Sequence, residues 1–202
     1  LYSGDFHPHL EEAFLTHMAG PAGRNPADPV FVVVHTNYLG IRLSRALAER
    51  AGGHLNVRFM TLKDLAARCA PVPLPGGRAM LPRGGDAVVV RRLLDEGIAE
   101  GGYFSDVAER PGMAPVLLAA IRDLKEASYS PKSFLDAARE GGLLRGGPRG
   151  KCAELARLWS AYEGFLADRK SADDADLMRY AAELLESAGS DRAAGRLIVY
   201  GF

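Results

Sequence analysis

The sequence has few cysteines, no excess of either charge and no long apolar run. Only Cys69 and Cys152 are present among 202 residues, and they form no C-x-x-C pair. This argues against a zinc site or a disulfide framework and predicts a reducing, cytoplasmic setting. Lys+Arg and Asp+Glu both number 25, so no overall field selects nucleic acid or an anionic membrane. No apolar run approaches the roughly 18 residues of a membrane span, so we expect no membrane partner.

The first residues also lack the parts of a phosphate-binding loop. A short strand is expected to enter the turn Ser3-Gly4-Asp5, with a helix starting near His9. A P-loop would fill that turn with G-x-x-x-x-G-K-[ST], whereas this turn has one glycine and no lysine. His7 and His9 have no third partner at a useful spacing, so we expect no metal site. The chain opens on Leu1 and stops just after an apolar strand, and we expect it to be part of a longer polypeptide.

Residues 1–70 alternate between strand and helix patterns. The runs VFVVVHT and LNVRFMT are β-branched or apolar and too short for helices, as expected of buried parallel strands. Helical segments follow each run, the first stopped by Gly52-Gly53 and the second capped by Thr61 with Asp64 three residues later. This βαβα order predicts a parallel sheet with right-handed crossovers.

The pattern changes after a Pro/Gly-rich break at 71–85. Residues 86–188 show helical periodicity and no convincing strand, and Ser130-Pro131 is a typical helix start. Trp159 and Tyr162 fall on an apolar stripe and are interpreted as core, and the acidic group at 173–176 as a helix cap. A strand returns at Leu197–Tyr200.

The fold expected is therefore α/β, a partial RecA/P-loop-like parallel sheet with a large all-helical insertion. The first part of the α/β core is assigned to 1–70, the insertion to 71–190 and the returning strand of the core to 191–202. The three strands, at about 30–35, 55–60 and 196–200, should share one sheet.

This order of elements resembles superfamily 1 helicases of the UvrD/Rep type. The segment VVVHTNYLGIRLSRAL is similar to their Thr-Asn motif, and NVRFMTLKDLAARC to the motif on the next strand. The helical segments AAIRDLKEASYSPKSFLDAA, KCAELARLWSAYEGFLADR and SADDADLMRYAAELL are closer to AddB-type subunits of bacterial helicase–nucleases, as is LIVYGF before the Walker B position. The resemblance covers nearly all of the chain.

The AddB resemblance implies a helicase-like scaffold without motor activity, which acts on DNA ends together with a motor helicase–nuclease subunit. The whole protein would be an exonuclease subunit, with its nuclease site and iron–sulfur cysteines far downstream. Tyr200 stands at the Walker B position, where the family's carboxylates would hold Mg²⁺. With the lysine of the P-loop also absent, we expect no nucleotide site at Ser3, Gly4 and Asp5, and no cofactor in this segment.

Several residues are candidates for weak binding of single-stranded DNA. Each has a structural alternative: Thr36 and Thr61 as helix caps, and the lysines and arginines as solvated side chains. The candidates are Thr36, Asn37, Thr61, Lys63, Arg145, Arg149 and Lys151.

The function predicted is a non-catalytic scaffold and DNA-guiding segment in double-strand break repair and recombination. Two alternatives stay open at this point: an active ATPase and helicase with a degenerate nucleotide site, and a stand-alone α/β protein-binding module.

Overall fold

The structure is a computed structural model, and it divides the chain into two compact units. The first contains Leu1–Ala70 and Tyr180–Phe202, and the second contains Pro71–Arg179. The residues that the structure describes are 6–19, 28–71, 73–144, 147–188 and 196–202.

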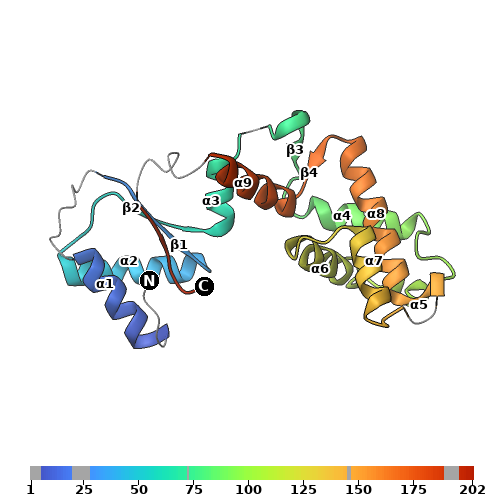
Figure 1. The fold of residues 1–202 in the computed structure, drawn as a ribbon, viewed down its shortest axis with the longest axis horizontal. Coiled ribbons are helices and arrows are strands. Elements are labelled where there is room, and N and C mark those ends of the chain that lie inside the picture. The colour runs from blue at the N-terminus through green and yellow to red at the C-terminus, as the bar shows by residue number, and fades with distance from the viewer. Residues whose placement is uncertain (1–5, 20–27, 72, 145–146, 189–195) are drawn as a thin grey trace. The chain divides into compact units, whose positions relative to one another are not determined.

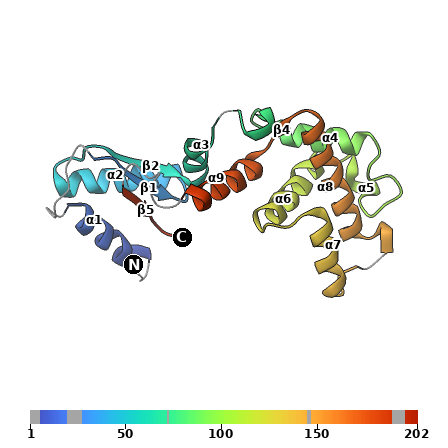
Figure 2. The same cartoon turned by 45° about the horizontal axis from the view of Figure 1, so that its top comes forward.

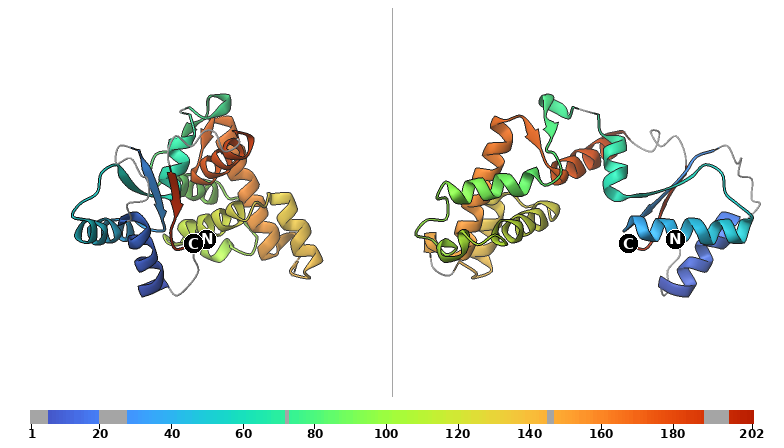
Figure 3. Two further views of the ribbon diagram at one scale, coloured as in Figure 1. Left: turned by 60° about the vertical axis from the view of Figure 1, so that its left-hand side comes forward. Right: turned by 180° about the vertical axis from the view of Figure 1, so that it is seen from behind.

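The first unit is built on a three-stranded sheet. Its strands are β1 (Val30–Val34), β2 (Val57–Thr61) and β5 (Arg196–Val199), in the order β2-β1-β5. β1 pairs in parallel with both neighbours, with Val33 opposite Met60 on one side and Val199 on the other. The left view of Figure 3 shows the blue β1 beside the red β5. The α/β fold and the return of the last strand to the first sheet are thus confirmed.

Helices cover both faces of this sheet (Figure 1). A single π-helical turn (Phe6–Leu10) leads into α1 (Glu11–Ala19). Side chains of α1 and α2 (Asn37–Ala51) pack on the face that carries Val30, Val32 and Val34. On the other face, the guanidinium of Arg68 from α3 (Leu62–Cys69) lies 4.7 Å from the centre of the Phe31 ring.

The ends of these helices follow from local chemistry. Thr36 is extended and its Oγ1 accepts a hydrogen bond from the Leu39 N–H, which satisfies one free donor of the first turn of α2. Gly52 ends α2 with φ of 69°, a left-handed conformation that glycine adopts without strain. Thr61 and Asp64 form the expected capping box at the start of α3.

The second unit is mainly helical (Figure 2). Ser130 caps α7 and Pro131 is its first residue, as expected. The elements are a 3₁₀ turn (Pro75–Gly77), β3 (Ala79–Met80), α4 (Gly85–Asp95), α5 (Ser105–Ala108), α6 (Met113–Glu126), α7 (Pro131–Glu140), a second 3₁₀ turn (Gly147–Arg149), α8 (Lys151–Asp168), β4 (Ser171–Ala172) and the start of α9 (Asp174–Ala188).

One expectation for this unit is wrong. Residues 86–188 do contain a strand, because β4 pairs in parallel with β3. Each strand has only two residues, which is too short to produce an alternating pattern in the sequence.

The core of the second unit lies between α4, α6 and α8. Trp159 and Tyr162 are 1% and 0% exposed, so their interpretation as core is confirmed. Leu117, Leu118 and Ile121 of α6 join the same cluster. Within the described residues, no helix combines the length and apolar character needed to cross a membrane.

Candidate nucleic-acid interface

The carboxyl ends of the three parallel strands meet at one edge of the sheet. Val34 lies opposite Thr61, and Val33 opposite Val199, so the residues that follow each strand emerge together. In open parallel sheets this edge is where ligands usually bind. The candidates Thr36, Asn37, Thr61 and Lys63 all come from this edge, as does Tyr200.

Thr36 and Asn37 are exposed at the start of α2. The Thr36 hydroxyl accepts from the Leu39 N–H at 3.2 Å. A hydroxyl that accepts one bond still has a proton to donate, so the cap leaves Thr36 able to contact a phosphate oxygen. The following residue, Tyr38, is 79% exposed. Tyr38 was not among the candidates predicted from the sequence, although an aromatic residue directly after Thr36-Asn37 could have indicated a surface on which a base stacks.

Thr61 is more fully used by its own helix. Its backbone N–H and its hydroxyl donate to Asp64 Oδ2 at 2.9 and 2.7 Å, and the Asp64 N–H donates back to Thr61 Oγ1. The side-chain and backbone hydrogen bonds from Thr61 lower the pKa of Asp64, with a smaller effect from the charge of Lys63. Thr61 is thus mainly a cap, whereas Lys63 is exposed beside it.

Tyr200 belongs to the core of the first unit. It is 5% exposed, and its ring meets that of Phe14 edge to face, with 5.5 Å between centroids. Burial raises the pKa of the Tyr200 phenol. At this position the chain therefore packs an aromatic ring on Phe14 of α1.

A second aromatic contact lies at the same edge. The rings of His35 and Phe202 are stacked, with centroids 4.0 Å apart and planes 25° apart. His35 directly follows β1, whereas Phe202 lies three residues beyond the end of β5 and is 62% exposed. This pair was also missed, because neither residue belongs to a motif; only the pairing of β1 with β5 brings the two rings together.

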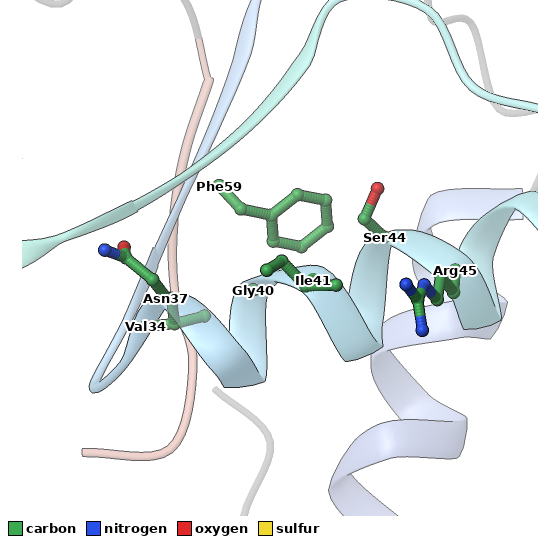
Figure 4. A pocket seen from close by; sticks show the side chains of 7 residues that line it. All are labelled: Val34, Asn37, Gly40, Ile41, Ser44, Arg45 and Phe59. Carbon is green, nitrogen blue, oxygen red and sulfur yellow. The ribbon is translucent and has the colours of Figure 1, made fainter.

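A pocket of about 440 Å³ opens beside Asn37 (Figure 4). Its wall is formed by α2 on one side and by the ring of Phe59 from β2 on the other. Gly40 lies against this ring, and a Cβ added to it would be 3.0 Å from Phe59 Cβ. The lining residues are Val34, Asn37, Gly40, Ile41, Ser44, Arg45 and Phe59.

The remaining sequence candidates are not part of this edge as described. Ser3, Gly4, Asp5 and Arg145 lie outside the described residues. Arg149 and Lys151 are exposed in the second unit, at the end of a 3₁₀ turn and the start of α8.

The acidic residues at the start of α9 cap the helix and form buried ion pairs. Asp173 caps the helix, accepting from the Asp176 N–H at 2.9 Å, as the cap interpretation predicts. Sequence reasoning missed their partner Lys125, which is 7% exposed and lies 2.8 Å from Asp173 and 3.3 Å from Asp176. Tyr162 also donates to Asp173, at 3.0 Å. In the described part of the chain, no group of three or more His, Cys, Asp or Glu residues is placed to hold a metal ion.

Comparison with known proteins gives a distant relationship. No family model matches the chain. It is 27% identical, over 175 residues, to the B-type subunit of the ATP-dependent helicase/deoxyribonuclease of Pelotomaculum thermopropionicum. The match covers 83% of this chain but only 15% of that protein. The chain is therefore distantly related to a helicase/deoxyribonuclease subunit, and it spans a small part of that relative's length.

Proposed function

We propose that this chain is a non-catalytic, helicase-like segment of a helicase–nuclease subunit, and that it guides single-stranded DNA at the carboxyl edge of its sheet. The distant relationship to a helicase/deoxyribonuclease subunit supports a role in DNA double-strand break repair and recombination, alongside a motor protein. The parallel sheet supports the helicase-like scaffold.

The observation that carries the proposal is the group of exposed side chains at this edge. Thr36 and Asn37 provide hydrogen-bond donors for a phosphate, and Lys63 provides a positive charge. Tyr38 and Phe202 expose aromatic surface on which bases stack without sequence preference. A phosphate-binding group next to stacking surfaces is the arrangement that single strands require.

Binding should be weak, because the chain has no net charge and its phosphate contacts are few, and it should weaken further as the salt concentration rises. On a single strand each neutralised phosphate contributes about −0.7 to the slope of log K against log salt, so Lys63 alone should give a slope of about −0.7. Replacing Thr36 by valine together with Lys63 by methionine should weaken binding of an oligothymidylate in a fluorescence-anisotropy titration. Lys132→Met, on an exposed face of α7, is the matched control.

The second set, Arg149→Met with Lys151→Met, tests the basic turn before α8 separately. If neither set changes the affinity for the oligothymidylate, the proposed DNA path is wrong. A fall with the first set alone would place the path at the sheet edge and not at the basic turn.

The nucleotide site should be inactive. The packing of Tyr200 on Phe14 supports this, because this position holds a buried aromatic ring and offers no carboxylate that could bind a magnesium ion. Calorimetric titration with ATP and Mg²⁺ should give no binding in the micromolar range, which would correspond to about −8 kcal/mol. Micromolar affinity would instead support the alternative of a working ATPase.

A further inference from the structure

The outer edge of β2 is unpaired in the part of the chain that the structure describes. β2 is the last strand of the sheet and pairs only with β1. The Val30 N–H donates to the Asn56 carbonyl at 2.9 Å, and Val30 lies opposite Val57. Because alternate residues bond to each neighbour in a parallel ladder, the peptide groups of Val57 and Phe59 point away from β1. An added strand could therefore bond to this edge.

The pocket of Figure 4 lies beside this same edge. The Phe59 ring forms one wall, and α2 forms the other with Ile41, which is 53% exposed. Side chains of a strand alternate between its two faces. An apolar side chain on a strand added next to Phe59 would thus point to the face on which the pocket opens.

Exposed apolar residues lie on the same two elements or directly next to them. Leu55 lies just before β2 and is 65% exposed, and Leu62 follows β2 and is 44% exposed. Tyr38 and Ile41 lie three residues apart on α2, which places them on one side of the helix. Large apolar side chains concentrated beside an open strand edge are typical of a protein-binding surface.

Two arginines define the charge of this surface. Arg45 lines the pocket, and Arg58 lies on the opposite face of β2 from Phe59; both are exposed. Neither makes an ion pair with any residue that the structure describes, unlike Arg42 and Arg50 on the same helix, which pair with Glu11 and Glu12. Unpaired cations at the rim favour an acidic partner.

We propose that the edge of β2 binds an extended segment of a partner protein in which apolar and acidic residues alternate. The backbone of the segment would bond to the peptide groups of Val57 and Phe59. Its apolar side chains would enter the pocket beside Ile41, and its acidic side chains would lie on the face of Arg58. The free backbone groups favour a peptide over DNA, since a nucleic acid strand cannot continue a β-ladder.

The test uses the 202-residue chain and fluorescein-labelled peptides of about nine residues with alternating Val/Leu/Phe and Asp/Glu, a length typical of a longer strand. Each peptide is paired with a version N-methylated at every residue, which has lost the backbone donors that pairing with a strand edge requires. A labelled oligothymidylate is titrated in parallel. The variant is Arg45→Glu with Arg58→Glu, and the control is Arg83→Glu, an exposed arginine of the second unit that also lacks an ion pair among the described residues.

We expect at least one unmodified peptide to bind, and N-methylation to abolish binding. The double variant should weaken peptide binding by about tenfold or more, while Arg83→Glu leaves it unchanged. Oligothymidylate affinity should change by less than about threefold in the double variant, since its proposed contacts are at Thr36 and Lys63. Absence of peptide binding at about 1 mM, or binding that survives N-methylation, would overturn the proposal. A large loss of oligothymidylate affinity with peptide binding unchanged would assign this surface to DNA and overturn it too.

Discussion

Replacing Lys125 by methionine should lower the free energy of unfolding of the second unit by about 3–5 kcal/mol. The ammonium group is almost fully buried and pairs with Asp173, Asp176 and the half-buried Glu163; the two aspartates are 4% and 2% exposed as side chains. Removing it leaves the buried Asp173 carboxylate without its cation, whereas Asp176 keeps its ion pairs with Arg78 and Arg179. Removing one partner of a buried ion pair strongly destabilises a protein, because the other charge stays buried without compensation.

Urea denaturation followed by tryptophan fluorescence measures this effect directly. Trp159 is the only tryptophan in the chain and lies in the core of the same unit. Lys132→Met, which removes an exposed lysine from α7, should change the free energy of unfolding by less than about 0.5 kcal/mol. Equal effects of the two substitutions on the free energy of unfolding would show that the buried ion pairs do not stabilise the second unit.

The same ion pairs predict a pH dependence. Burial alone would raise the pKa of Asp173, but the charge and hydrogen bond of Lys125 outweigh it and hold the pKa below its usual 3.8. The carboxylate therefore stabilises the fold at pH values above about 4, and this contribution is lost as the pH falls through the lowered pKa. The difference in stability between wild type and Lys125→Met should shrink over that acidic range.

Leu43→Ala should lower the stability of the first unit by about 2–5 kcal/mol. Leu43 is 0% exposed and packs α2 on the sheet. The control, Ile41→Ala, lies two residues away on the same helix at a residue that is 53% exposed, and should change stability little. Far-UV circular dichroism in urea reports the loss of helix and strand.

Each unit has its own hydrophobic cluster, so we expect the units to unfold separately. The fluorescence transition of Trp159 should then stay unchanged in Leu43→Ala while the dichroism transition broadens or splits. A shift of both transitions by the same amount would show that the chain unfolds as one cooperative unit.

The sheet could be predicted from sequence because its strands have a strong local signal. Val30–Val34 is a continuous apolar run, as expected for a parallel strand buried on both faces, and the helices around it begin at Thr36 and Thr61 with recognisable caps. The return of β5 to this sheet followed from an apolar run after a long helical stretch.

The features that could not be predicted depend on contacts between distant residues. Lys125 and Asp173 are 48 positions apart, and nothing in the helical pattern around Lys125 marks it as buried. The stacking of His35 on Phe202 depends on the pairing of β1 with β5. The role of Tyr200 was predicted only as a missing carboxylate, whereas its packing against Phe14 needed the fold.

The most direct test of the proposed DNA path is photo-crosslinking of the chain to single-stranded DNA that carries 5-iodouracil, followed by mass spectrometry of the crosslinked peptides. The aromatic rings at the sheet edge, Tyr38 and Phe202, are well suited to react with a stacked base. We predict that crosslinks concentrate at residues 35–38 and at Phe202 and disappear at high salt. Crosslinks confined to the second unit, or spread evenly over the chain, would contradict the proposal that the carboxyl edge of the sheet guides DNA.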